Sequence, residues 1–146
     1  MADLFPHTGL LPTDPVQRAK ARFFIEVDCE PLVETWWAYM RQPEPVDALV
    51  EAAIEAAISF QEKLMGKFAL GERFTAVDAA VVPFLLRVEL SSELKDGGEL
   101  CRRVQERAPR FWQYYQHVKT HPSVASTFDR VRTCTRMATG PQLTRW

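Results

Sequence analysis

Apolar positions along this chain recur mostly at intervals of three and four residues, the spacing of an amphipathic helix. The first such run begins at Asp14 and Pro15, where a capping acceptor is followed by a proline suited to a first helical turn. Pro31 is expected to kink this helix because proline removes a backbone donor. The spacing resumes beyond the kink and stops before Pro43. The recurring apolar positions are Val16, Ala19, Phe23, Val27, Leu32, Trp36, Tyr39 and Met40.

A second long helix is predicted from Val46 to Met65, with Gly66 as its stop. Only a few residues join it to the first helix, so the two are expected to run antiparallel as a helical hairpin. Later in the chain, shorter amphipathic helices are predicted over Glu99 to Arg107, Pro109 to Thr120, and Ser123 to about Thr135.

Between these two groups of helices lies an almost unbroken apolar run, TAVDAAVVPFLLRVE, from Thr75 to Glu89. Thr75 can cap the exposed amides of a helix start, while Asp78 can accept from the Thr75 amide, which makes a capping box. Because the helix is apolar nearly all round, it must lie at the domain centre, where its first turn needs such partners. Thr75 and Asp78 are therefore predicted to be structural capping residues, with a perturbed catalytic acid as the lesser alternative for Asp78.

The chain has 146 residues and no internal repeat or low-complexity tract, so it is of the size for one domain with a hydrophobic core. The pattern as a whole predicts an all-α helical bundle. We interpret residues 1–13 as a lead-in, 14–136 as the helical domain and 137–146 as an irregular tail.

Charge and composition exclude several classes of partner. Eighteen Lys and Arg balance 19 Asp and Glu, so we expect no binding to nucleic acid and none to an anionic membrane. The longest apolar run, Ala79 to Leu86, is far short of the roughly 20 residues of a membrane helix. The three cysteines form no CxxC pair, which argues against a disulfide framework or a structural zinc site. The N-terminal residues lack the pattern of a signal peptide, and we expect a cytoplasmic protein.

His117 and His121 lie one helical turn apart, a spacing that can place two imidazoles on one metal ion. No third ligand is identifiable nearby, so we predict a surface pair and no metal site.

Three stretches resemble the C-terminal helical domain of the glutathione transferase family. GERFTAVDAAVVPFLLRVE, with its Thr-x-x-Asp before an apolar helix, is similar to that domain's buried central helix. LLPTDPVQRAKAR resembles the family's domain linker and the start of the following helix, and APRFWQYYQHVKTHPSV resembles a late helix with its Pro-Ser turn. The likeness covers nearly the whole chain in the same order. A weaker likeness is to fungal members that serve secondary-metabolite pathways.

The resemblance implies an enzyme that uses glutathione as cosubstrate on a small hydrophobic substrate, by thiol conjugation or by glutathione-dependent isomerisation of a double bond. In that family the inner face of the first helix supplies part of the substrate pocket. This makes Glu30, Glu34 and Trp37, near the kink, candidates for substrate binding. Tyr39 and Arg22 are added to this set of substrate-binding candidates. A solvated acidic face is the alternative for the two glutamates, and support of the linker is the alternative for Arg22.

Trp36 and Trp37 are adjacent, so their side chains leave the helix about 100° apart and cannot both enter one core. One is expected in the core and the other in a cleft or an interface.

The chain also departs from the pattern of the family that it resembles. In the family a thioredoxin-like half binds glutathione and activates its thiol, and here only MADLFP precedes the linker, so no catalytic residue is assigned. The second hypothesis is a non-catalytic helical domain that docks onto a partner. We expect either a homodimer or docking to another protein.

Overall fold

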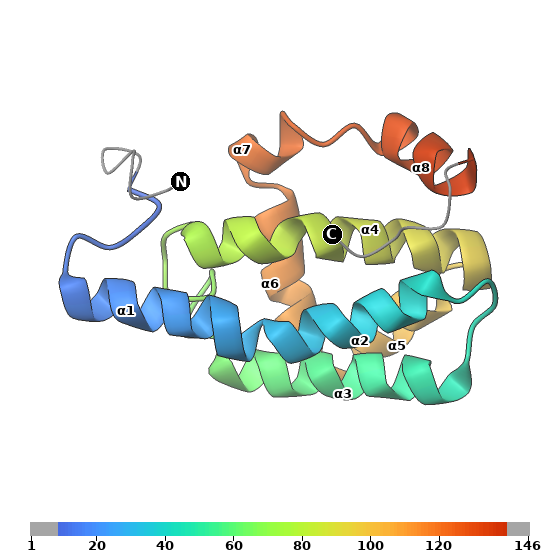
Figure 1. Cartoon of the computed structure of the whole chain (residues 1–146), viewed down its shortest axis with the longest axis horizontal. Coiled ribbons are helices and arrows are strands. Elements are labelled where there is room, and N and C mark those ends of the chain that lie inside the picture. Colours follow the sequence, from blue (N-terminus) through green and yellow to red (C-terminus); the bar gives the residue numbers. More distant parts are fainter. Residues whose placement is uncertain (1–8, 140–146) are drawn as a thin grey trace.

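The structure, a computed structural model, describes residues 9–139, with side chains described as far as residue 135. Over this range it is a bundle of helices, and the one β-type pairing is an isolated bridge between Phe68 and Gly71. The helices are α1 Pro15–Phe23, the π-helix η3 Phe24–Asp28, α2 Glu30–Arg41, α3 Asp47–Lys63, α4 Ala76–Asp96, α5 Glu99–Arg107, α6 Pro109–Lys119, α7 Pro122–Ala125 and α8 Arg130–Thr139 (Figure 1). The all-α prediction is confirmed.

The first long arm consists of α1, η3 and α2. Asp14 caps α1 by accepting a hydrogen bond from the Gln17 backbone N–H at 2.8 Å. The expected kink is a single π turn, closed by the Cys29 N–H and the Phe24 carbonyl at 2.9 Å. A proline ring crowds the carbonyl four residues before it, and the wider turn lies just where Pro31 would meet that carbonyl.

The N-terminal part of the apolar pattern that predicts the first helix does not face the core, whereas its later positions, from Leu32 on, do. Val16 is 62% exposed, Phe23 is 61% exposed and Val27 is 46% exposed. Ala21 and Phe24 are the buried positions on this part of the arm. The arm therefore carries a second apolar surface, which the bundle leaves uncovered.

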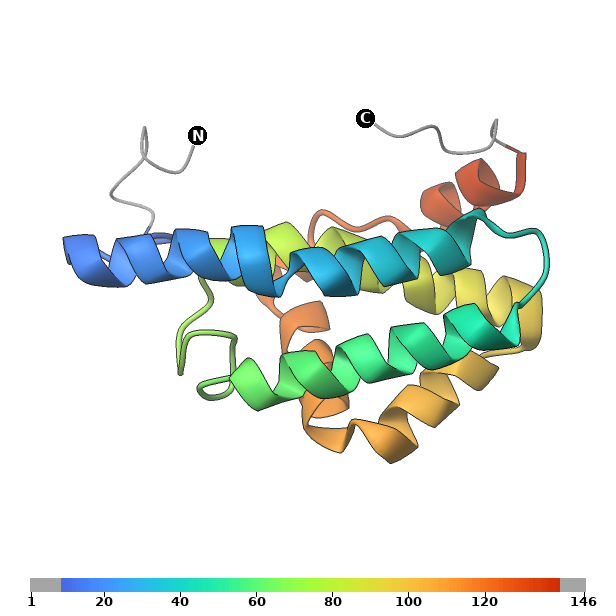
Figure 2. The ribbon, with the colours of Figure 1, turned by 60° about the horizontal axis from the view of Figure 1, so that its bottom comes forward.

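The helices α2 and α3 form the predicted antiparallel hairpin and lie side by side (Figure 2). Trp36 fixes their contact, because its indole N–H donates to the Ala53 carbonyl at 2.9 Å. Gly66 is not the stop of α3, which ends at Lys63. A Cβ atom on Gly66 would lie 2.9 Å from Gly71 Cα, so this glycine permits a close approach of two backbone segments.

The central position belongs to α4, which contacts α1, η3, α2, α5, α6 and α8. It is apolar nearly all round as predicted, and Val77, Val81 and Leu85 on it are fully buried. Beside it an aromatic cluster centres on Phe60, whose ring lies 5.7 Å from both Phe111 and Tyr114. Pro83 lies inside α4 on its exposed side.

The final predicted helix, Ser123 to about Thr135, is wrong as a single element. The chain forms the short helix α7, a turn, and then α8 (Figure 1). Asp129 begins α8 by accepting from the Arg132 backbone N–H at 2.9 Å. Val131, on the predicted apolar face, is 77% exposed. Within the predicted tail 137–146, residues 137–139 continue α8 and the rest lie outside the described residues, as do residues 1–8 of the predicted lead-in.

Candidate functional site

The start of α4 is held by the buried carboxylate of Asp78. Its Oδ2 accepts from the Thr75 N–H at 2.7 Å and from the Thr75 hydroxyl at 3.0 Å. Its Oδ1 accepts from the Ala69 N–H at 2.9 Å, which ties the preceding loop to the helix. The side chain has no exposed surface, so these contacts serve the fold and leave no face of Asp78 for a substrate.

The predicted substrate-binding residues do not converge on one pocket. Arg22, Glu30 and Glu34 are exposed along the first arm. Trp37 is half-buried, with its ring 6.3 Å from that of Phe84 on α4. None of these four lines either of the two cavities described below.

Tyr39 lies in the core, where its hydroxyl donates to Asp96 Oδ2 at 2.8 Å. Burial, followed by the contact with Asp96, raises the pKa of Tyr39 well above its ordinary value. Its backbone carbonyl also accepts from Lys95 Nζ at 2.9 Å. The geometry therefore makes Tyr39 a link between α2 and the end of α4, without a surface that a substrate could reach.

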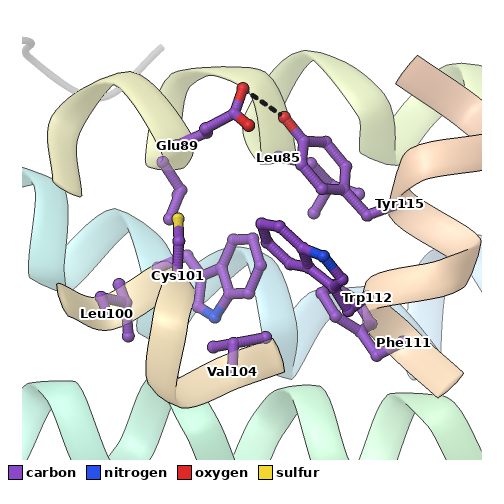
Figure 3. Close-up of a pocket in the computed structure, with 10 residues that line it drawn as sticks. Leu85, Glu89, Leu100, Cys101, Val104, Phe111, Trp112 and Tyr115 are labelled. Atoms are coloured by element: carbon purple, nitrogen blue, oxygen red, sulfur yellow. Dashed lines mark hydrogen bonds between the residues drawn. The ribbon is translucent and has the colours of Figure 1, made fainter. Parts of the chain in front are cut away.

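A small cavity lies between α2, α4, α5 and α6, and Cys101 and Trp112 are among the residues that line it (Figure 3). Its volume is only about 10 Å³, about enough for one water molecule. Tyr115 at its edge donates to Glu89 at 2.8 Å. Burial raises the pKa of the Cys101 thiol to about 12, so this cysteine is not a thiolate at neutral pH. The cavity is a packing feature and holds no substrate.

A larger groove of about 530 Å³ lies between α4, α7 and α8. The exposed side of the first half of α4 forms one wall, and the α7 to α8 segment forms the other. Leu10 and Phe74 close one end from the lead-in and the loop before α4. The apolar lining is made by Leu10, Phe74, Ala79, Val82, Pro83, Leu86, Val124 and Phe128.

Polar groups of the groove lie on both of its walls. Arg87 belongs to α4, and its Nη1 donates to the Pro83 carbonyl one turn earlier at 2.7 Å. Arg132 and Asp129 belong to the start of α8. The remaining polar lining is supplied by Ser123, Thr127 and Thr133. The sequence pattern did not identify these groove residues, because they come from four separate segments with no shared motif.

The helix α8 is attached to α4 through charge. Arg130 pairs with Glu93 and lies 3.7 Å from Glu89, and Glu89 also accepts from Lys119 Nζ at 2.6 Å. The Arg130 guanidinium lowers the pKa of Glu93 below its ordinary value of 4.5. This network holds α8 in place as the outer wall of the groove.

His121, one of the two histidines considered for metal binding, stacks on Phe74 with ring centroids 4.1 Å apart. Among the described residues no cluster of three or more His, Cys, Asp or Glu side chains is arranged to hold a metal ion. None of the helices over residues 9–139 is long and apolar enough to cross a membrane.

Residues 19–117 match the family model for the glutathione S-transferase C-terminal domain. Glutathione transferase Omega 2C from Trametes versicolor is 34% identical with a TM-score of 0.76, and the match covers 94% of this chain and 61% of that one. Omega 1C from the same fungus is 33% identical with a TM-score of 0.76, and that match covers 94% and 60% of the two chains.

The trimeric glutathione transferase TDR1 of Leishmania is 19% identical with a TM-score of 0.66 over 88% of this chain and 29% of that chain, a likeness that shows the fold alone. A search of curated protein sequences found no match. The chain thus spans about three fifths of the length of the two Omega transferases, 61% and 60%. Because the family model matches more than half of its residues, the chain belongs to the glutathione S-transferase C-terminal domain family.

Proposed function

We propose that this chain is the substrate-binding half of a glutathione-dependent enzyme and holds a small hydrophobic substrate in the groove between α4, α7 and α8. The observation that carries the proposal is the groove itself. Its volume of about 530 Å³ and its mainly apolar lining with a few polar groups are typical of small-molecule sites. Family membership supports glutathione as the cosubstrate.

Glutathione, when bound, supplies a thiol that either adds to an electrophilic carbon or isomerises a double bond by reversible addition. The residues of this chain would bind and orient the substrate and exclude water from it. Burial raises the pKa of Cys29 and of Cys101 to about 12 and raises the pKa of Tyr39 well above its ordinary value, so none of the three is suited to activate a thiol near neutral pH. Secondary-metabolite biosynthesis is the setting that we propose for this activity.

Trp37 is retained as a substrate contact. Its ring packs edge-on against that of Phe84 on α4, the helix that forms one wall of the groove, although neither ring lines the groove itself. A half-exposed indole is suited to pack against a conjugated substrate. Arg22, Glu30 and Glu34 stay candidates because they are exposed, whereas the buried Tyr39 is not retained.

The test is the quenching of tryptophan fluorescence by a hydrophobic polyene. We expect Trp37→Ala to remove most of the quenching, and Trp112→Ala, on the far side of α4, to leave it. Ala79→Trp, which adds bulk to the groove wall, should weaken polyene binding about tenfold by steric exclusion. Equal binding by the parent chain and by Ala79→Trp, together with quenching that survives Trp37→Ala, would place the ligand elsewhere.

A second measurement concerns turnover. We expect the 146-residue chain to show little conjugation of glutathione to 1-chloro-2,4-dinitrobenzene, because no described residue is placed to ionise a thiol. Efficient turnover by this chain would contradict that expectation.

The alternative function, a docking domain without catalysis, is favoured by one observation. Val16, Phe23 and Val27 form an exposed apolar stripe along the first arm, and such a stripe is typical of a surface that a partner covers. The partner would be a second copy of this chain or another protein domain.

A further inference from the structure

We infer that the groove between α4, α7 and α8 selects substrates that carry a negative charge, namely small apolar molecules with a carboxylate. The inference rests on the proposed function for the location of the site and adds the chemical class of the substrate. It is carried by two arginines, Arg87 and Arg132, which line the groove from α4 and from α8.

Neither arginine is neutralised by a carboxylate among the described residues. Arg87 donates to a backbone carbonyl of its own helix, which leaves its positive charge uncompensated. The guanidinium of Arg132 forms no ion pair with a described side chain. Its contact with Asp129 runs through the backbone, because the Arg132 N–H donates to the Asp129 carboxylate. Four arginines outside the groove differ, because Arg102, Arg103, Arg107 and Arg130 each pair with at least one glutamate. Arg18 and Arg110, also outside the groove, donate to backbone carbonyls as Arg87 does.

The groove lining holds one acidic side chain among the described residues, that of Asp129. Its Oδ1 accepts from the Arg132 N–H at 2.9 Å at the start of α8. A carboxylate in that position is satisfied by the backbone and by the helix dipole, so it is not the natural partner of either guanidinium. The lining therefore carries two positive side chains, Arg87 and Arg132, and one negative side chain, Asp129. This excess of positive charge favours a negatively charged ligand.

The apolar part of the lining determines what else the ligand must contain. Val82 and Leu86 of α4 are buried, and Val124 and half-buried Phe128 lie opposite them on the α7 to α8 segment. A small inorganic anion would leave this apolar surface uncovered. A molecule with an apolar part and one carboxylate can cover the surface and also reach an arginine. Guanidinium groups favour carboxylates because their N–H donors match both oxygens.

Glutathione also carries carboxylates, and the same arginines could in principle serve the cosubstrate. The lining favours the substrate instead, because eight of its fourteen residues are apolar, a poor match for a polar tripeptide. The experiment separates the two sources by competition.

The experiment is a calorimetric titration of the 146-residue chain with 4-phenylbutyrate and with the neutral isostere 4-phenylbutanol. We expect the carboxylate to bind about tenfold more tightly than the alcohol, a preference that falls as salt screens the exposed arginines. Arg87→Gln and Arg132→Gln should each weaken binding of the carboxylate severalfold and leave the alcohol unchanged. The matched control is Arg102→Gln, since Arg102 pairs with glutamates on its own helix outside the groove and should affect neither ligand.

Three results would overturn the inference, and they are distinguishable. Equal affinity for the carboxylate and the alcohol would remove the charge preference while the groove remained the substrate site. Displacement of 4-phenylbutyrate by millimolar glutathione, lost in Arg87→Gln and Arg132→Gln, would assign the arginines to the cosubstrate. If neither probe binds to the parent chain or to Ala79→Trp, the proposed function is refuted as well. Thermal melts of each variant check that it is folded.

Discussion

Asp78 has no exposed surface, yet both oxygens of its carboxylate accept hydrogen bonds at 3.0 Å or less from Thr75 and Ala69. A buried polar group is costly unless it is bonded in this way. Tyr114 packs into the same region, and burial, with Asp78 nearby, raises the pKa of its hydroxyl well above the ordinary value. At the residue scale, therefore, the chemistry around Asp78 serves to hold α4 and the preceding loop together.

Asp78→Ala is expected to lower the free energy of unfolding by about 3 kcal/mol, because it leaves the buried Thr75 and Ala69 amides without an acceptor. Asp78→Asn should lower the free energy of unfolding by about half as much, since the one oxygen of the amide can still accept a hydrogen bond from either Thr75 or Ala69. Denaturant titration measures both. The control is Asp14→Ala at an exposed N-cap, for which we expect about 1 kcal/mol. A loss for Asp78→Ala no larger than for the control would contradict the buried cap.

At the scale of elements, α8 differs from the rest of the bundle. Its contacts with the central helix run through the pair of Arg130 with Glu93 and the longer approach to Glu89. Among the described side chains of α8, the apolar Val131 points to solvent, and the described contacts that attach α8 itself are ionic. Elements held by few apolar contacts are the first to open locally.

This attachment should depend on pH. The pKa of Glu93 is lowered in the folded chain by Arg130 from an ordinary value of 4.5, so the pair contributes its full stability above pH 4.5 and loses it as the pH falls through the lower, folded pKa. Because both side chains are more than a third exposed, the pair is worth only about 0.5 kcal/mol.

We therefore expect Glu93→Gln to be slightly less stable than the parent chain at neutral pH and equally stable at pH values well below 4.5. Thermal melts followed by circular dichroism across this range provide the measurement. A difference that persists unchanged into acid would show that Glu93 acts through something other than its charge.

For the whole molecule, the uncovered stripe of Val16, Phe23 and Val27 is the main feature that the bundle does not explain internally. These positions recur on one side of the first arm, while the opposite side, with Ala21 and Phe24, packs on the core. Apolar surface arranged in this way is expected to be covered in solution.

We expect the chain to self-associate through this stripe, and Phe23→Lys to shift it toward monomer because a charge in an apolar contact is costly. Sedimentation velocity over a range of protein concentrations tests this. Leu94→Lys, at an apolar side chain that is 54% exposed on α4, is the matched control and should leave the association unchanged. A strict monomer for the parent chain would contradict self-association and leave docking to a different protein.

The local features of this chain could be predicted from its amino-acid sequence. The spacing of apolar residues, the Asp14–Pro15 start, the kink before Pro31 and the capping box at Thr75 all follow from hydrogen bonds between residues three to five apart. The nearly continuous apolar character of the run from Thr75 to Glu89 also identified the central helix, because a helix with few polar side chains is expected to be buried over most of its surface.

Which helix faces are covered and which segments meet could not be predicted from the sequence, because both depend on how the helices pack in space. The spacing of Val16, Phe23 and Val27 predicts a helix equally well whether that face lies in the core or in solvent, and here it lies in solvent. Burial of Tyr39 and half-exposure of Trp37 depend on Asp96 and Phe84, which lie about fifty residues further along the chain. The groove forms because α8 packs beside α4. Periodicity of apolar residues predicts a single helix and does not predict which other helix packs against it.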